Sequence, residues 1–183
     1  MRVVAGSARG RRLVVPAGRD VRPTSDRVRE AVFNALHSLG AIEGARVLDL
    51  FAGSGALAIE ALSRGARQAV LVERDRRARE AIGQNLSATG FAGQAEVVAG
   101  DAESYLARAP GRFDLVLADP PYVYDGWPSL LAAIAGVLDP GGVVVVESDR
   151  EVPLPPGWDV ERVKRYGGTL VMFARPPSPP ETR

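Results

Sequence analysis

The chain has 183 residues, 46% hydrophobic and 25% charged, which is the composition of one ordinary globular domain. It contains no cysteine and a single histidine, which excludes a disulfide scaffold, catalytic thiols and thiolate zinc sites, and we expect no metal site. No apolar run approaches the roughly 20 residues that cross a bilayer, so we expect a cytoplasmic protein without membrane contact.

The N-terminal end is basic. Residues 1–30 hold eight arginines against three acids, whereas the whole chain has a net charge of +1. A basic N-terminal segment in a protein that is otherwise nearly neutral predicts a polyanionic partner such as nucleic acid. The alternative is ordinary surface charge, because arginine is the general cation of this chain and Lys164 is its only lysine. The candidate RNA contacts are Arg2, Arg9, Arg11, Arg12 and Arg22.

Residues 1–39 are expected to form an extension of the domain, made of a basic hairpin and a helix. Residues 2–5 and 11–15, separated by a glycine-containing turn, are typical of a short β-hairpin. Thr24 or Ser25 can cap a helix that continues to about residue 39, because apolar residues recur there at helical spacing. His37 falls on the opposite face of this helix, so we expect it to be exposed to solvent.

From residue 46 onward, short apolar strands alternate with amphipathic helices. This rhythm predicts an α/β protein with a Rossmann-like, seven-stranded, mostly parallel sheet over residues 40–175. The last two strands follow each other directly and should form an antiparallel hairpin. A turn is expected at residues 139–142, and the proline-rich residues 176–183 should be a disordered tail. The predicted strands are 46–50, 68–73, 95–99, 113–118, 142–147, 158–164 and 169–174, and the predicted helices after residue 46 are 55–64, 75–89, 102–108 and 127–138.

A glycine turn follows the first strand of this sheet, in the stretch LDLFAGSGALAIEAL. Gly53, Ser54 and Gly55 allow a sharp turn and the close approach of a ligand to the start of the next helix. Glu73 ends the following strand, where a carboxylate can bind the hydroxyl groups of a ribose. The same turn also satisfies the dinucleotide fingerprint G-x-G-x-x-A, so a nicotinamide-dependent oxidoreductase is an open alternative.

Two further acids stand at strand ends. Asp49 precedes the glycine turn and would repel a pyrophosphate, but it suits a ligand with an ammonium and a sulfonium group, such as S-adenosylmethionine. Asp101 and Ala102 follow the third strand, where they could contact the edge of an adenine. Carboxyl ends of parallel strands meet at one edge of a sheet, which favours a shared ligand site. The alternative is that Asp49 and Asp101 only cap helices.

The stretch Asp119-Pro120-Pro121-Tyr122 ends the fourth strand. Asp119 and the carbonyl of Pro120 can accept hydrogen bonds from an amine on a planar ring, while Pro121 fixes that carbonyl in an extended backbone. Tyr122 offers a flat face on which an unstacked base can stack. The alternative is a strand that ends in two prolines, with Tyr122 packed for structural reasons.

With these motifs the chain resembles the class I methyltransferases that use S-adenosylmethionine, and within them the RsmD family, which methylates N2 of guanine in bacterial 16S ribosomal RNA. The resemblance rests on RVVAGSARGRRLVVP, RPTSDRVREAVFN, LDLFAGSGALAIEALSRGA, LVERD, ADPPY and VVVVES. It implies guanine 966 of the small ribosomal subunit as the target and a monomer that releases S-adenosylhomocysteine. The residues that it adds to the cofactor site are Thr24, Arg27, Asn34, Phe51, Ala52, Arg74 and, beside its role at the amine, Asp119.

Other activities fit parts of the same pattern. A methyltransferase acting on DNA adenine or on a protein glutamine would use the same logic at residues 119–122. A non-catalytic RNA-binding module could retain the fold without the reaction. The complete stretch from Asp119 to Tyr122 favours an enzyme, and the basic N-terminal end favours RNA.

Overall fold

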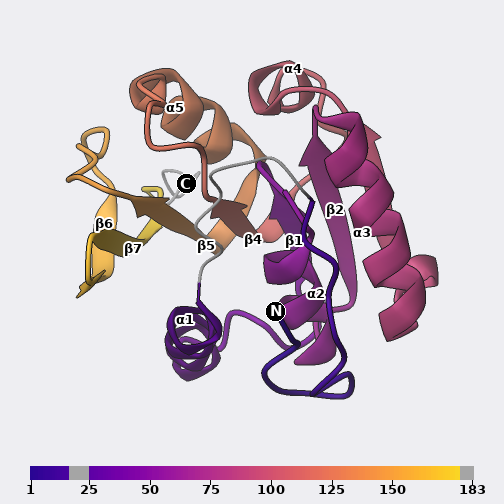
Figure 1. The fold of residues 1–183 in the computed structure, drawn as a ribbon. Coiled ribbons are helices and arrows are strands. Elements are labelled where there is room, and N and C mark those ends of the chain that lie inside the picture. Colours follow the sequence, from indigo (N-terminus) through magenta and orange to yellow (C-terminus); the bar gives the residue numbers. More distant parts are fainter. Residues whose placement is uncertain (17–24, 178–183) are drawn as a thin grey trace.

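The described residues, 1–16 and 25–177 of the computed structural model, form one seven-stranded sheet with the strand order β3-β2-β1-β4-β5-β7-β6 (Figure 1). The neighbouring strands from β3 to β5 in this order are parallel, and β7 runs antiparallel to both of its neighbours. This confirms the predicted Rossmann-like α/β fold and its antiparallel C-terminal hairpin. The strands are β1 Arg46–Asp49, β2 Gln68–Glu73, β3 Ala95–Ala99, β4 Phe113–Ala118, β5 Leu138–Ser148, β6 Asp159–Tyr166 and β7 Thr169–Arg175.

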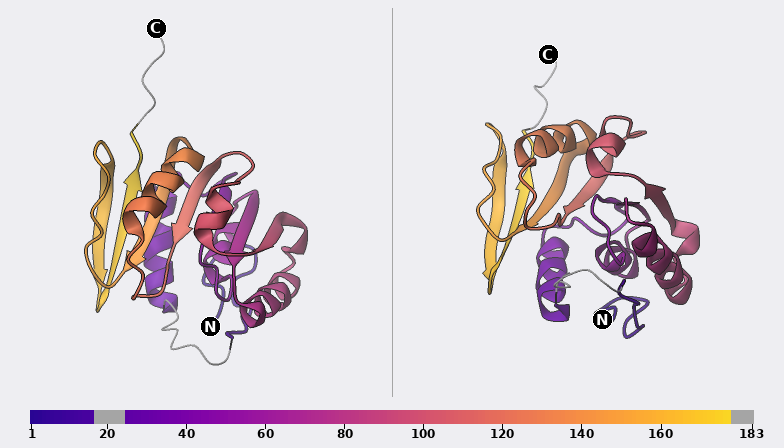
Figure 2. Two further views of the ribbon diagram at one scale, coloured as in Figure 1. Left: turned by 90° about the horizontal axis from the view of Figure 1, so that it is seen from above. Right: turned by 45° about the horizontal axis from the view of Figure 1, so that its top comes forward.

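Helices cover both faces of the sheet, as parallel strands require (Figures 1 and 2). Along β1, Val47 packs into the core beneath α1, α2 and α3, whereas its neighbour Leu48 packs into the core beneath α4 and α5. Alternate side chains of one strand therefore serve opposite layers. The helices are α1 Asp26–Ser38, α2 Ala56–Ser63, α3 Arg76–Thr89, α4 Ala102–Leu106 and α5 Trp127–Val137, with a short 3₁₀ helix at Ala92–Gln94.

The prediction that a turn at residues 139–142 precedes the fifth strand is wrong, because β5 already begins at Leu138. Phe113 of β4 pairs with Leu138, and Leu115 pairs with Val143, so the four intervening residues bulge out of a ladder that resumes beyond them. Gly141 adopts a φ of +80° within this bulge, a conformation that favours glycine. The structure therefore has a bulge within β5 where the sequence predicts a turn, because Leu138 already pairs with β4.

Residues 1–16, which we call the N-terminal arm, form a shorter β-ladder than predicted. Only Arg2 and Arg12 form a β-bridge, flanked by backbone hydrogen bonds such as Val3 N to Arg11 O at 3.0 Å. The two predicted strands are corrected to this bridge, because side chains of α2 and α3 bind much of the arm's backbone. Val3 and Leu13 nevertheless lie in the same core as α1 and the sheet.

Several predictions concern the ends of the domain. Ser25 is the N-cap of α1 and accepts a hydrogen bond from Val28 N, and His37 is exposed as expected. Arg22, Thr24 and most of the predicted tail lie outside the described residues. The proposed boundary between residues 39 and 40 stays a prediction. Within residues 1–16 and 25–177, no helix is long and apolar enough to cross a membrane.

Candidate active site

The glycine turn between β1 and α2 depends on two glycines. Gly53 and Gly55 have φ values of +56° and +78°, which side chains rarely tolerate. A Cβ on Gly55 would also lie 3.1 Å from Cδ2 of Leu71 and press against the core. By contrast, a Cβ on Gly53 would meet only Phe51 O, at 4.0 Å. The turn therefore brings bare backbone to the carboxyl edge of the sheet, as the sequence predicts.

Glu73 fastens this turn to the end of β2. Its Oε2 accepts a hydrogen bond from Gly53 N at 2.9 Å, and its Oε1 accepts one from Asp75 N at 2.8 Å. A carboxylate offers about four acceptor positions, so these bonds are compatible with the predicted contact to a ribose. That contact stays a prediction.

Asp49 is a buried carboxyl group at the end of β1, with 1% of its surface exposed. Neither of its oxygens has a hydrogen-bond partner among the described residues. The pKa of Asp49 is raised to about 7, mainly by burial and also by the negative charge of Glu73. The backbone amides of Ala58 and Phe51 act in the opposite direction. A buried carboxyl without a completed hydrogen bond is costly in the free protein, which makes Asp49 a candidate for binding a ligand; this role stays a prediction.

The stretch Asp119-Pro120-Pro121-Tyr122 continues from β4, and β4 lies directly beside β1. Leu50 N donates a hydrogen bond to Leu117 O at 3.0 Å, so the segments that continue β1 and β4 stay side by side up to the site. Asp119 is half-buried, Pro120 is buried, and Tyr122 is 39% exposed. Pro120 to Tyr122 border a shallow recess whose other walls are Tyr124, Trp127, Glu147, Ser148 and Asp149.

An aromatic contact joins the two motifs. The rings of Phe51, beside the glycine turn, and Tyr124, after the double proline, meet edge to face at 5.6 Å. Tyr124 makes a second such contact with Trp127 at 5.4 Å, and its hydroxyl donates to Glu103 Oε1 at 2.5 Å. Burial and the Glu103 carboxylate raise the pKa of Tyr124, so the hydroxyl keeps its proton. Tyr124 therefore holds the recess against the glycine turn, a role that the sequence alone did not suggest.

Asp101 caps α4, which is the structural alternative weighed from the sequence. Its carboxylate accepts hydrogen bonds from Ser104 N at 2.8 Å and from Ser104 Oγ at 3.0 Å, and these bonds lower its pKa. Asp101 is exposed and Ala102 is buried. The predicted contacts of both residues with an adenine stay predictions, as does that of the exposed Arg74.

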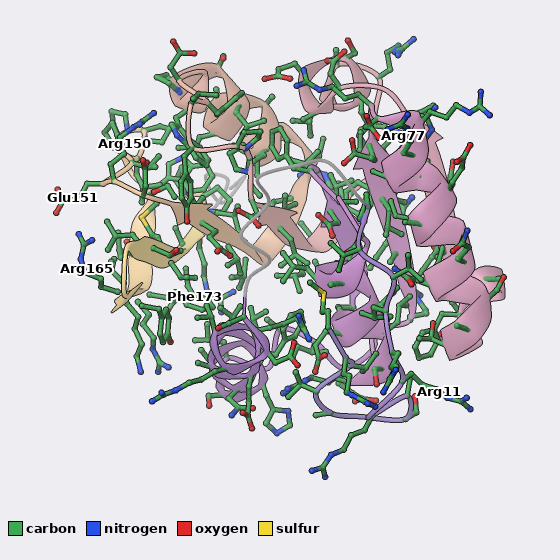
Figure 3. All side chains as sticks on the ribbon, viewed as in Figure 1. Arg11, Arg77, Arg150, Glu151, Arg165 and Phe173 are labelled. Carbon is green, nitrogen blue, oxygen red and sulfur yellow. The ribbon has the colours of Figure 1, made fainter. Side chains whose placement is uncertain are left out.

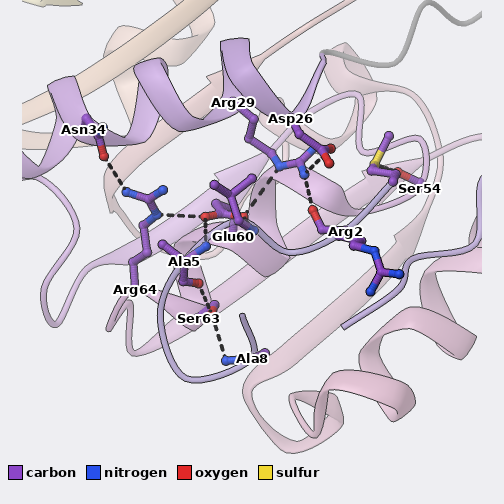
Figure 4. Close-up of polar contacts among 12 residues, drawn as sticks. Arg2, Ala5, Ala8, Asp26, Arg29, Asn34, Ser54, Glu60, Ser63 and Arg64 are labelled. Carbon is purple, nitrogen blue, oxygen red and sulfur yellow. Dashed lines mark hydrogen bonds and ion pairs between the residues drawn. The ribbon is translucent and has the colours of Figure 1, made fainter. Parts of the chain in front are cut away.

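Asn34 is not near the glycine turn. Its Oδ1 accepts a hydrogen bond from Arg64 at 3.0 Å, and Arg64 follows the last residue of α2, at the end opposite the turn (Figure 4). The expected contact of Asn34 with the cofactor stays a prediction. Arg27 is exposed on α1, and its predicted role is untested.

The fully buried charged residues of α1 and α2 were missed by the sequence analysis. Glu60 of α2 accepts hydrogen bonds from Val4 N at 2.8 Å, Ala5 N at 3.0 Å and Arg64 Nε at 2.8 Å. Arg29 of α1 lies 3.5 Å from the same carboxylate and binds Asp26 at 2.9 Å (Figure 4). The sequence could have indicated that Glu60 is buried, because it is the one charged residue in the largely apolar helix α2. This network ties the N-terminal arm to α1 and α2.

Glu60→Ala is expected to lower the free energy of unfolding by about 3–5 kcal/mol, because it removes the buried carboxylate that faces the buried Arg29 and that binds Val4 N and Ala5 N. The matched control is Glu80→Ala, which removes the exposed Arg76–Glu80 pair and should cost less than about 1 kcal/mol. Urea denaturation of both variants measures the difference. Equal losses would show that the buried carboxylate does not hold the arm.

Asn85 of α3 connects the N-terminal arm to the glycine turn. This buried side chain accepts from Val14 N at 2.7 Å and donates to Val14 O at 2.9 Å and to Ser54 O at 2.8 Å. Ser54 also contacts the arm through Met1, with 3.9 Å between Oγ and Sδ. The arm therefore packs against the turn as well as against α2.

Asn85→Leu is expected to release Val14 from α3, because the apolar side chain of similar size offers neither donor nor acceptor. Loss of one such hydrogen bond costs about 1 kcal/mol, so amide exchange at Val14 should accelerate about fivefold or more. Hydrogen exchange measured by mass spectrometry tests this, with Gln84→Leu on the exposed side of α3 as the control. Unchanged protection in the Asn85 variant would contradict the assigned link.

The candidate RNA contacts Arg2, Arg9, Arg11 and Arg12 are all exposed on the N-terminal arm, and Figure 3 shows Arg11 at its outer end. Arg2 also donates to Gly10 O at 2.9 Å, within the arm. Their role in RNA binding stays a prediction. Over the described ranges, no group of three or more histidine, aspartate or glutamate side chains could hold a metal ion.

Comparison with known proteins identifies relatives over almost the whole chain. The family model described as "Conserved hypothetical protein 95" matches residues 1–175. Bacillus subtilis YlbH is 42% identical over 160 residues, which cover 85% of this chain and 86% of the relative. The Escherichia coli K12 protein named ribosomal RNA small subunit methyltransferase D is 41% identical over 176 residues, covering 91% of this chain and 85% of the relative. The solved structure of Escherichia coli yhhF superimposes with a TM-score of 0.86 and 37% identity, covering 98% and 99% of the two chains.

Proposed function

Because the chain belongs to the RsmD family, whose model is described as conserved hypothetical protein 95, we propose that it methylates 16S ribosomal RNA. In this proposal the methyl group of S-adenosylmethionine is transferred to N2 of a guanine of the small ribosomal subunit, with guanine 966 as the implied position. The observation that carries the proposal is the pairing of β1 with β4, which sets the glycine turn beside Asp119-Pro120-Pro121-Tyr122. The enzyme would act in the cytoplasm as a monomer.

The residues at the glycine turn fit S-adenosylmethionine. Asp49 presents a buried carboxyl group without a completed hydrogen bond, and the amino group of the methionine portion is a cation that could complete it. Gly53 and Gly55 leave bare backbone beside it, and Glu73 ends the neighbouring strand as a candidate for the ribose. A pyrophosphate would instead place negative charge near Asp49 and Glu73. This contrast favours S-adenosylmethionine over a nicotinamide dinucleotide.

S-adenosylmethionine, when bound, supplies an electrophilic methyl group on a sulfonium. The chain's own task is to orient the guanine amine, whose lone pair is conjugated with the ring and therefore weakly nucleophilic. Asp119 and the Pro120 carbonyl accept hydrogen bonds from its two N–H groups, and Asp119 can take the proton that the amine loses. Tyr122 supports the ring by stacking, worth about 1–3 kcal/mol. Positioning of this kind accounts for much of the rate of such displacements.

Incorporation of tritiated methyl groups tests the proposal. We expect label in small ribosomal subunits or in 16S rRNA, and none in DNA or in protein. Label in DNA or protein would favour the other amino-methyltransferases that use the same motif. Thermal unfolding with S-adenosylhomocysteine or with NAD adds a second test, because a ligand at 100 times its Kd stabilises by about 2.7 kcal/mol. Stabilisation by NAD alone would overturn the cofactor assignment.

A further inference from the structure

The turn between β6 and β7 lies beside the candidate base site. The hydroxyl groups of Tyr122 and Thr169 are 2.8 Å apart and share a hydrogen bond, and Thr169 is the first residue of β7. The pairing of Ser148 with Leu170 places the start of β7 against the end of β5, at the carboxyl edge of the sheet. This end of the hairpin therefore contacts Tyr122, one of the residues that border the recess.

Three cations lie on β6 between its middle and the turn. We call Arg162, Lys164 and Arg165 the hairpin cations; no acid lies among residues 162–166. Lys164 and Arg165 are exposed and Arg162 is half-buried. Within the described ranges, none of the three side chains forms a hydrogen bond or an ion pair. Their positive charge is thus not neutralised by the parts of the chain that the structure describes.

The other two arginines of this region differ, because the fold uses them. Arg150 donates to Tyr124 O at 2.8 Å and pairs with Asp149 at 3.4 Å. Arg175 pairs with Glu161 at 2.6 Å, near the end of β6 that is remote from the turn. The cations without a partner among the described residues therefore lie in the half of β6 that leads to the turn, and Arg165, opposite Leu170, is the one nearest to Thr169 and its contact with Tyr122.

The strand register places the hairpin cations on both faces of the sheet. Arg162 and Lys164 lie opposite Phe173 and Val171, which pack into the core beneath α1. Arg165 lies opposite Leu170 and so points to the other face. A lysine on an edge strand often has a purely structural role, which is to prevent pairing with another chain. That role alone would not require two arginines beside it.

We propose that the hairpin cations bind the phosphates of the RNA strand on either side of the base that Tyr122 receives. The inference rests on the proposed function, because it takes RNA as the substrate. Phosphate contacts fix the position of a nucleic acid on a protein, and a base held on Tyr122 carries its own phosphates toward the turn that Tyr122 contacts. The hairpin is thus a second RNA-binding element, separate from the N-terminal arm.

Filter binding of a 16S rRNA transcript in the presence of S-adenosylhomocysteine tests this inference. Arg165→Glu is expected to weaken binding about tenfold or more and to reduce the slope of log K against log salt by about 1 between roughly 50 and 200 mM NaCl. The matched control is Arg77→Glu, an exposed arginine of α3 at the opposite side of the molecule (Figure 3), which should change binding less than about twofold. Equal effects of the two variants would overturn the inference.

Two further measurements keep the outcomes distinct. Affinity for S-adenosylhomocysteine should be the same in Arg165→Glu as in wild type. If that affinity falls, the RNA-binding measurement is repeated with Arg165→Gln, which removes the charge without reversing it. The inference then requires that Arg165→Gln also weakens RNA binding. Methylation by the wild-type protein tests the proposed function separately. A wild-type enzyme that methylates rRNA, with Arg165 and Arg77 variants that bind RNA equally, refutes only the role of the hairpin.

Discussion

Asp119→Ala is expected to reduce methylation of 16S rRNA at least about a thousandfold while leaving the affinity for S-adenosylhomocysteine within a few-fold of wild type. In the proposed mechanism the carboxylate accepts a hydrogen bond from the amine and can receive its proton. Removal therefore affects the reacting nitrogen, whereas the glycine turn and Asp49 remain in place. Single-turnover rates with saturating cofactor, together with calorimetric titration of S-adenosylhomocysteine, separate the two effects.

Two variants sharpen this test. Asp119→Asn keeps an oxygen acceptor but not the charge, so its activity should lie between those of Asp119→Ala and wild type. Asp125→Ala removes an exposed acid from the same segment and should retain wild-type activity. Normal turnover by Asp119→Ala would remove this residue from the mechanism. A loss of cofactor affinity equal to the loss of rate would assign it to binding instead.

Asp49→Asn is expected to weaken binding of S-adenosylhomocysteine about 10- to 100-fold, because a neutral amide replaces the carboxylate that would pair with the ligand's amino group. The wild-type affinity should also depend on pH. Burial raises the pKa of Asp49 to about 7 in the free protein, so a ligand that pairs with the carboxylate must displace a proton below that pH. Affinity should rise by up to about tenfold per pH unit as the pH approaches 7, and then level off.

Calorimetric titrations between about pH 5.5 and 8 measure this dependence, and buffers of different ionisation enthalpy report the released proton. Asp49→Asn should lose both the proton release and the pH dependence. A flat wild-type profile, or an Asn variant that binds as tightly as wild type, would contradict the assignment of Asp49 to the ligand.

The same raised pKa has a consequence for stability without ligand. An unfolded Asp49 loses its proton near its ordinary value of 3.8, whereas the folded one keeps it until about pH 7. The folded state therefore binds more protons in this window, and the contribution of Asp49 to stability decreases as the pH rises from about 4 to about 7. Above that range the penalty is constant. Relative to wild type, ligand-free Asp49→Asn should gain stability over this pH interval.

Much of the fold could be predicted because the local signals agree with the tertiary structure. The strands β2, β3 and β4 begin and end at the predicted residues, since each is a short apolar run bounded by polar or turn residues. The topology then follows from the alternation of strands and helices, and it places the glycine turn beside Asp119 without any further information. Site residues at the ends of neighbouring parallel strands are for this reason the easiest to predict.

The features that the sequence did not predict depend on contacts between distant segments. The cofactor role of Asn34 rests on the family resemblance alone and stays a prediction, whereas its hydrogen bond to Arg64, 30 residues along the chain, was not foreseen. The N-terminal arm pairs with itself at the Arg2–Arg12 bridge, as expected in part, but its contacts with Glu60 of α2 and Asn85 of α3 were not predicted. Helical spacing of Arg29 with Val32, Phe33 and Leu36 could have revealed its burial. A buried arginine contradicts the usual expectation for a charge.

The most direct test of the account is the identity of the methylated nucleoside. Small ribosomal subunits from a strain that lacks this enzyme would be incubated with the wild-type protein and S-adenosylmethionine, and the 16S rRNA digested for mass spectrometry. The account predicts N2-methylguanosine at a single position, formed by wild type and not by Asp119→Ala. A methyl group on another atom or another nucleoside, or equal product from the Asp119 variant, would contradict it.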